Sequence, residues 1–262
     1  MPTIHANGIE LYYERAGAGL PLLLIHGLGS SSRDWELQVA AFAPAYQVIT
    51  FDLRGHGRSQ KPAGPYSIAQ FAADAAGLLR GLQIEAAHVV GLSLGGAVAF
   101  QLAVDAPTLA RTLTIVNSAP AWVPRSLGDR FKIWQRMVIV RLLGMRKMGE
   151  VLSKRLFIKP EQAEIRQTFV ERWAENDPVA YRAAMRALFG WSVADRIGGI
   201  RCAVLVVAAD EDYTPVALKE AYTAQMPHAR LVVIPDSRHA TPVEQPEAFN
   251  QALSDFLAAH DH

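Results

Sequence analysis

The pentad GLSLG at residues 91–95 is the feature that most constrains how this chain can fold. A short strand-like run, HVV at 88–90, enters the pentad, and a helix-like run rich in Ala, Val and Leu leaves it and continues to residue 104. A strand-to-helix turn of this kind is so tight that only glycine is tolerated on either side of its central residue. We therefore expect Ser93 to lie at the peak of a strained turn with its hydroxyl exposed, as a nucleophile requires.

Strand-like and helix-like segments alternate along the rest of the chain. Apolar runs typical of strands occupy 9–15, 21–25, 48–51, 112–116, 203–209 and 231–234, and helical spacing is found at 34–42, 68–82 and 243–258. Buried apolar strands that alternate with helices indicate a parallel sheet covered on both faces. We therefore predict an α/β fold with a mostly parallel central sheet, whose functional groups collect past the carboxyl ends of the strands.

The alternation stops between residues 119 and 190, where the spacing is helical throughout. One apolar face is predicted from the spacing of Phe131, Trp134, Val138, Leu142 and Met145. We predict a helical cap, or lid, at 119–190, inserted after strand 6 of a core domain that comprises 1–118 and 191–262.

A serine nucleophile needs a base that accepts its proton and an acid that holds this base in the correct tautomer. His239 is the best candidate for the base, since it follows the run at 231–234 and precedes the last predicted helix. The acid should come from the DED segment at 210–212, which follows the run at 203–209. We choose Asp212, with Asp210 as the second choice, because Asp212 lies further into the loop.

The segment HGLG at 26–29 follows the run at 21–25 and is predicted to complete the site. Its glycines let the backbone bend toward a substrate, which leaves the N–H of Leu28 free. The N–H of Leu94 points to the same space, so these two amides are predicted to form an oxyanion hole. The polar segment 52–59 is interpreted as a structural turn that shapes the floor of the site.

Together these segments resemble the α/β-hydrolase fold family, and most closely its small bacterial esterases, enol-lactonases and cofactor-free perhydrolases. The resemblance rests on HGLGSSSRDW, FDLRGHGRS, GLSLGG, the Asp212 loop with Pro215, and RHATPVEQPEAFNQAL. It covers residues 8 to about 258 apart from the lid. Arg238 and Ala209 depart from the pattern, since family members commonly carry glycine at both positions.

The resemblance implies Ser93 as nucleophile, His239 as base, Asp212 as acid, and Leu28 and Leu94 as oxyanion donors. It implies a cofactor-free serine hydrolase of carboxylic esters, and the apolar lid suggests hydrophobic substrates of small to medium size. Lactone hydrolysis, carbon–carbon bond hydrolysis and perhydrolysis use the same groups and stay open, as does a non-catalytic ligand-binding homologue. An apolar substrate pocket is assigned to three residues: Trp122, Trp134 and Leu142.

The lid segment 125–155 is strongly basic. It carries nine Lys and Arg residues against Asp129 and Glu150, a net charge of +7, whereas the whole chain has a net charge of +1. A basic amphipathic segment can lie on an anionic membrane surface or attract anionic substrates. We favour the interpretation that its apolar residues face the active site while its charges keep the lid hydrated, with membrane-surface contact as the alternative.

Other functional classes lack their sequence motifs. No G-x-G-x-x-G follows the first strand-like run, there is no P-loop, and the histidines show no H-x-x-x-H spacing, so neither a cofactor nor a metal is predicted. The near-zero net charge gives no indication of nucleic-acid binding. The single cysteine, Cys202, and the absence of a signal-peptide pattern suit a reducing compartment. We expect a cytoplasmic protein whose partner is a small-molecule ester or lactone.

Overall fold

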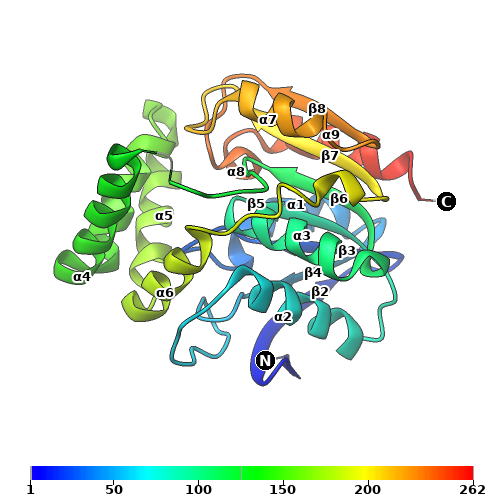
Figure 1. Cartoon of the computed structure of the whole chain (residues 1–262), viewed down its shortest axis with the longest axis horizontal. Coiled ribbons are helices and arrows are strands. Elements are labelled where there is room, and N and C mark those ends of the chain that lie inside the picture. The colour runs from blue at the N-terminus through cyan, green and yellow to red at the C-terminus, as the bar shows by residue number, and fades with distance from the viewer. Residues whose placement is uncertain (1, 125, 262) are drawn as a thin grey trace.

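The computed structural model describes residues 2–124 and 126–261 and contains an eight-stranded sheet (Figure 1). The order across the sheet is β1-β2-β4-β3-β5-β6-β7-β8. β1 and β2 pair antiparallel, as do β2 and β4, and every pair from β4 to β8 is parallel. The strands are β1 (Thr3–Ala6), β2 (Ile9–Ala16), β3 (Leu20–Ile25), β4 (Tyr46–Phe51), β5 (Ala87–Leu92), β6 (Ala110–Val116), β7 (Ala203–Ala209) and β8 (Ala229–Ile234).

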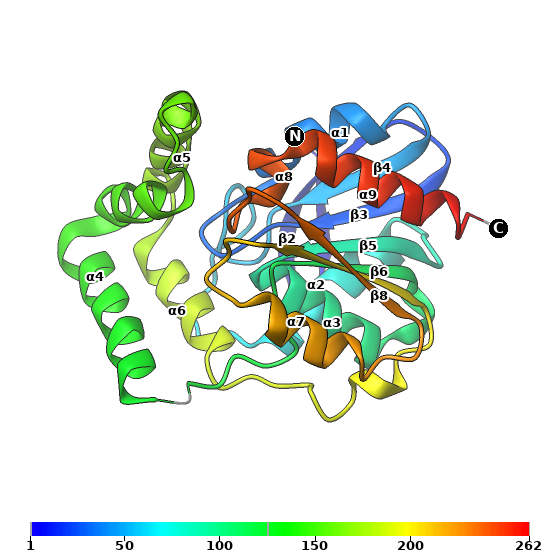
Figure 2. The same cartoon turned by 90° about the horizontal axis from the view of Figure 1, so that it is seen from above.

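Helices cover both faces of this sheet (Figure 2). One face carries α2 (Ile68–Gly81), α3 (Leu94–Asp105) and α7 (Val216–Thr223), and the other carries α1 (Glu36–Phe42), α8 (Thr241–Glu244) and α9 (Pro246–Ala258). Short 3-10 turns lie at Ser32–Trp35, Pro107–Leu109, Pro160–Gln162 and Ile197–Gly199. The predicted α/β fold with a mostly parallel sheet is therefore confirmed.

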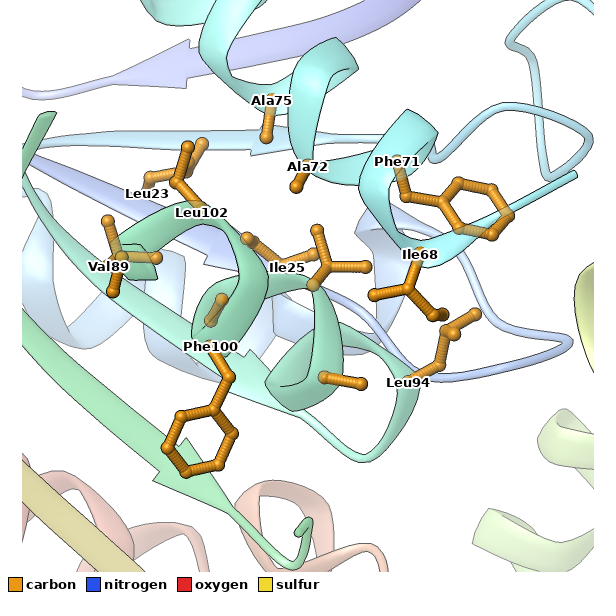
Figure 3. Close-up of a cluster of buried hydrophobic side chains, with 14 of the residues drawn as sticks. Leu23, Ile25, Ile68, Phe71, Ala72, Ala75, Val89, Leu94, Phe100 and Leu102 are labelled. Carbon is orange, nitrogen blue, oxygen red and sulfur yellow. The ribbon is translucent and has the colours of Figure 1, made fainter. Parts of the chain in front are cut away.

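The strand side chains alternate between two apolar cores, as the pleat of a strand requires. On β3, Leu23 and Ile25 face α2 and α3, whereas Leu22 and Leu24 face α9 on the opposite side. Figure 3 shows the first core, where Ile25 lies toward Ile68 of α2 and Leu23 lies beside Leu102 of α3. Because both faces of the central strands are buried, their sequences read as continuous apolar runs.

Three helices follow β6 and lie beside the carboxyl ends of the strands, separate from the two helical layers (Figures 1 and 2). They are α4 (Leu127–Leu156), α5 (Ala163–Ala174) and α6 (Pro178–Leu188). Ser126 caps α4 by accepting the N–H of Asp129, and α4 bends at Gly144, where φ is 79°. Arg125, one of the basic residues of the lid segment, lies outside the described residues. Within the described ranges, no helix is long and apolar enough to cross a membrane.

Of the apolar face predicted for α4, Met145 is buried among the lid helices, but the first half of the face was wrong. Phe131, Trp134 and Leu142 are 58%, 59% and 71% exposed, so they point away from the packed side of the helix. The side that packs against the other lid helices instead carries Ile133 and Met137. Both stripes are apolar at helical spacing, and only the position of α5 and α6 decides which one is buried.

Two other elements differ from the prediction. The strand Thr3–Ala6 was missed, because it is a short and largely exposed edge strand without an apolar run. The last predicted helix is broken into α8 and α9 at Gln245, since the residue before a proline, here Pro246, is disfavoured in the helical region.

Candidate active site

Ser93 lies between β5 and α3 with φ 56° and ψ −112°, a strained conformation for a residue with a side chain. The flanking glycines make the turn sterically feasible. A Cβ at Gly91 would lie 2.2 Å from the carbonyl oxygen of Gly95, and a Cβ at Gly95 would lie 2.1 Å from that of Ile25. The N–H of Ser93 donates to the carbonyl oxygen of Val116 at 2.9 Å, which ties the turn to β6.

The two amides predicted as oxyanion donors belong to segments next to Ser93. Leu94 is the first residue of α3, so its N–H has no acceptor within the helix. Gly27 lies against the nucleophile turn, since a Cβ there would lie 3.6 Å from Cβ of Ser93. A hydrogen bond of 3.3 Å from the N–H of Ser30 to the carbonyl oxygen of Gly27 closes the turn that contains Leu28.

His26 supports this turn from behind. Its Nε2 accepts the N–H of Leu53 at 2.9 Å, so its Nδ1, which lies 2.8 Å from the carbonyl oxygen of Gly27, carries the proton and donates it. Complete burial lowers the pKa of His26, which keeps the ring neutral. In the neighbouring segment 52–59, the carboxylate of Asp52 accepts the N–H of Arg58 at 2.7 Å. These contacts are structural, in agreement with the interpretation of 52–59 as a turn.

The loops after β7 and β8 bring Asp212 and His239 together. Nδ1 of His239 lies 2.8 Å from Oδ1 of Asp212. The other carboxylate oxygen accepts from the hydroxyl of Thr214 and, at 2.8 Å, from the fully buried ammonium of Lys219. Burial by itself would raise the pKa of Asp212, but the interactions with His239 and Lys219 outweigh it and lower that pKa to about 2. Asp212 is therefore a carboxylate at neutral pH.

Asp210 has a different place in the same loop. Its carboxylate accepts the N–H of Asp236 at 3.0 Å and that of Ser237 at 3.1 Å, so it braces the loop that leads to the histidine. Arg238, one of the departures from the family pattern, forms an ion pair with Glu211. Its charge is thus neutralised by a carboxylate of the acid loop.

Two polar side chains, the half-buried Glu244 and the buried Asn117, hold the backbone around His239. Glu244 accepts the N–H of Arg238 at 3.1 Å and that of Ala240 at 2.8 Å, on either side of the histidine. The amide of Asn117 donates to the carbonyl oxygen of His239 at 3.1 Å, and its Oδ1 accepts a backbone N–H at the end of β7 at 2.9 Å. These contacts fix the base loop relative to the acid loop.

Tyr213 is a site residue that sequence reasoning missed. Its hydroxyl lies 2.6 Å from Nε2 of His239, and the tyrosine ring lies 4.2 Å from the imidazole, centroid to centroid. Tyr213 is 60% exposed, but its hydroxyl is enclosed; this burial and the charge of Asp212 raise the pKa of the phenol. The available signal was the position of Tyr213 directly after the predicted acid.

Ser93 itself is only 8% exposed, so its hydroxyl is less accessible than expected.

The residues assigned to a substrate pocket do not form one group. Trp134 and Leu142 are mostly exposed on α4. Trp122 is half-buried and packs against the core that contains α2 and α3, and its backbone N–H donates to the carbonyl oxygen of Trp191 at 2.9 Å. Their exposure argues against a place for Trp134 and Leu142 in an enclosed acyl pocket.

A cavity of about 210 Å³ opens beside Gly29, between the core and α5. None of Ser93, His239 and Asp212 lines it, so it is a neighbour of the candidate site rather than part of it. Its charged lining is balanced, with Arg33, Arg58 and Arg172 against Asp34, Asp52 and Glu175. Across the described part of the chain, no cluster of three or more His, Cys, Asp or Glu side chains could hold a metal ion.

Comparison with known proteins agrees with this architecture. A profile of the alpha/beta hydrolase family matches residues 22–252. The chain is 32% identical to a putative carbamate hydrolase, RutD, of Azorhizobium caulinodans over 100% of both chains. It is also 32% identical to 3-oxoadipate enol-lactonase 2 of Acinetobacter baylyi, over 96% of this chain and 94% of the relative.

A solved structure with the same fold is that of a thermophilic esterase from Thermogutta terrifontis. It is 28% identical to this chain, covers 100% of both chains and superposes with a TM-score of 0.91. The fold, the family profile and these relatives agree over nearly the whole length. The chain therefore belongs to the alpha/beta hydrolase family and is a hydrolase.

Proposed function

We propose that this hydrolase cleaves carboxylic esters through an acyl-enzyme, with Ser93, His239 and Asp212 as its catalytic triad. The observation that carries the proposal is the 2.8 Å hydrogen bond between Oδ1 of Asp212 and Nδ1 of His239, made by loops that end at the same edge of the sheet as Ser93. Because Nδ1 carries the proton that Asp212 accepts, Nε2 is the free basic nitrogen. The esterase and enol-lactonase among the relatives support this chemistry.

In the acylation step, the oxygen of Ser93 attacks the carbonyl carbon of the ester while its proton passes to Nε2 of His239. Negative charge develops on the carbonyl oxygen, and the amides of Leu28 and Leu94 donate hydrogen bonds to it. The imidazolium then gives its proton to the leaving alcohol as the carbon–oxygen bond breaks. Asp212 stabilises the imidazolium throughout.

In the second step, a water molecule attacks the acyl carbon and gives its proton to His239. The bond between the acyl carbon and the oxygen of Ser93 breaks, and the serine recovers its proton from the imidazolium. The products are the carboxylic acid and the free enzyme, so the cycle needs neither metal nor cofactor.

The hydroxyl of Tyr213 occupies Nε2 in the structure and must leave before Ser93 can transfer its proton directly. We infer that substrate binding displaces it, because the exposed ring lies on a loop and can move without disturbing the core. The free enzyme is then a resting state in which the phenol is hydrogen-bonded to the base.

Lactone hydrolysis is the second candidate, because an enol-lactonase is among the relatives of nearly equal length. A lactone is an internal ester, so the same triad and oxyanion donors would open it. We further propose that 1–118 and 191–262 form the catalytic core and 119–190 a lid that bounds the substrate site.

The test is a chain-length series of p-nitrophenyl esters and a parallel series of lactones, measured on wild type and Ser93→Ala. We expect turnover of one series that peaks at one acyl length and is lost in Ser93→Ala. Turnover of lactones alone would favour the second candidate. No serine-dependent turnover in either series, with the protein folded by circular dichroism, would contradict the proposed function.

A further inference from the structure

Arg136 differs from every other basic residue of α4. This helix carries eight Lys and Arg residues, and seven of them are exposed, whereas Arg136 is half-buried. Its Nε donates to the hydroxyl of Tyr181 at 2.5 Å, and its guanidinium lies 5.9 Å from the ring of Trp173 and 5.6 Å from that of Tyr181. The guanidinium is therefore held in one orientation by aromatic residues of α5 and α6.

These contacts place Arg136 on the side of the lid that faces the candidate active site. Trp173 packs directly on the turn that contains Leu28, since a Cβ at Gly29 would lie 2.8 Å from its ring. The charge of Arg136 is also near enough to Tyr213 to oppose, in part, the rise of its pKa that burial causes, and the Tyr213 hydroxyl lies 2.6 Å from Nε2 of His239. Arg136 is thus linked to the oxyanion side of the site through Trp173 and to its acid side through Tyr213.

The charge of Arg136 has no counter-charge in the structure. Among residues 2–124 and 126–261, no carboxylate forms an ion pair with it, and its two Nη groups have no hydrogen-bond acceptor. The indole N–H of Trp173, in the same cluster, is buried and likewise lacks an acceptor. Neither Nη atom of Arg136 is fully buried, so both remain open to water or to a ligand. The lid thus holds, next to the turn that contains Leu28, a positive charge without a counter-charge among the described residues and donors without a protein acceptor.

We propose that Arg136 binds a carboxylate carried by the substrate, so that the enzyme prefers esters or lactones with a second, ionised carboxyl group. The proposal rests on the proposed function and names its substrate class. A carboxylate matches the two free Nη groups, because the planar fork of a guanidinium pairs with both of its oxygens. One guanidinium also balances one negative charge, which a monoanionic carboxylate supplies.

The experiment compares substrates that differ only in this group. Monoethyl succinate, glutarate and adipate each have a neutral counterpart with the same acyl length, namely ethyl butyrate, valerate and hexanoate. Hydrolysis is followed by pH-stat for wild type, Arg136→Gln, Arg136→Lys and Arg141→Gln. Arg141 is the matched control, because it is an exposed arginine of the same helix.

We expect wild type to prefer the half-ester at one acyl length by roughly 10- to 100-fold in kcat/KM, the range of a charge-assisted hydrogen bond. Arg136→Gln should abolish this preference, mainly through KM, and should leave the neutral esters nearly unchanged. Arg136→Lys should restore part of the preference, and Arg141→Gln should behave as wild type. Equal losses on both substrates, or the same effect from Arg141→Gln, would overturn the proposal.

A binding measurement separates this proposal from the proposed function. Calorimetric titration of Ser93→Ala with the half-esters and the neutral esters needs no turnover. Tighter binding of the half-ester, lost in the double variant Ser93→Ala with Arg136→Gln, would support the carboxylate site even if no ester is hydrolysed. Equal affinity for both esters would refute the carboxylate site even if Ser93 proves to be the nucleophile.

Discussion

Replacing Ser93 by glycine and by alanine separates the strain of the turn from the chemistry of the hydroxyl. Both variants lose the nucleophile, so both are expected to be inactive. Only alanine keeps the Cβ that makes φ 56° and ψ −112° unfavourable. The difference in stability between the two variants therefore measures the strain at this position.

The magnitude follows from opposing contributions. At an ordinary buried position, glycine is less stable than alanine by about 0.5–1 kcal/mol of chain entropy. The lost methyl group adds roughly 0.8 kcal/mol. A residue held at a sparsely populated backbone conformation costs about 1–3 kcal/mol, and glycine avoids this cost. We therefore expect the stability of Ser93→Gly to lie between about 0.8 kcal/mol below and about 1.7 kcal/mol above that of Ser93→Ala, instead of the full loss seen at an unstrained position.

The assay is urea unfolding followed by tryptophan fluorescence, with thermal unfolding as a second measurement, in which 1 kcal/mol corresponds to about 2–4 °C for a chain of this size. Ala99→Gly is the matched control, because Ala99 is fully buried in the helix that follows Ser93. It should lose about 1.5 kcal/mol or more relative to wild type. The two differences in the free energy of unfolding, Ser93→Ala minus Ser93→Gly and wild type minus Ala99→Gly, are then compared. If they are equal, the turn is not strained and the reasoning fails.

Three further predictions concern the acid and base loops. Asp212→Asn should lower kcat/KM by about 10³- to 10⁴-fold, because it removes the charge that stabilises the imidazolium, whereas Asp210→Asn should cost less than about tenfold. Ester kinetics on both variants decide this, and the reverse order would show that the acid is misassigned. Tyr213→Phe should leave kcat/KM unchanged or raise it by up to about tenfold, because substrate no longer has to break a hydrogen bond to His239. A loss of about 100-fold or more would instead mean that the phenol relays the serine proton. Burial raises the pKa of Glu244 to about 7 despite the two N–H groups that it accepts, so the folded state holds this proton more tightly than the unfolded state. The stability that this proton contributes is present below the unfolded pKa near 4.5 and is lost as pH rises through about 7. The free energy of unfolding of wild type relative to Glu244→Gln should therefore fall by on the order of 2 kcal/mol between pH 4.5 and 8. Urea unfolding across this pH range tests this, and parallel curves for the two proteins would contradict it.

The parts of the fold that the sequence predicted correctly are those in which local pattern and burial coincide. The runs that become β3, β5, β6 and β7 are buried on both faces, so their apolar character is continuous and unmistakable. The lid shows the opposite case. The first half of α4 has two apolar stripes, and periodicity alone does not state which one packs. The bend at Gly144 then shifts the register of the second half, which a straight helical pattern does not anticipate.

The residues of the candidate site also differ in whether local sequence or tertiary contacts determine them. Chain order and position after a strand were sufficient to select Ser93 and His239, because parallel strands deliver their following loops to one edge of the sheet. Which carboxylate of the DED segment reaches the histidine depends on the path of the loop, and the structure places Asp212 there. Glu244 and Asn117 carry no local signal, since their role consists of contacts with backbone that is distant in sequence.

By itself, the sequence determined the strained turn at Ser93, because the steric demands of two glycines and one side chain act within five residues. It also determined the sheet, because apolar strands must be buried. Only the tertiary structure decided that the hydroxyl of Tyr213 lies against Nε2 of His239. Only the tertiary structure likewise decided that Arg136, alone among the basic residues of its helix, is half-buried, with no counter-charge in the part of the chain that the structure describes. These features arise where segments that are far apart in the chain meet, and the residues involved resemble ordinary surface residues until the packing of the lid and loops is known.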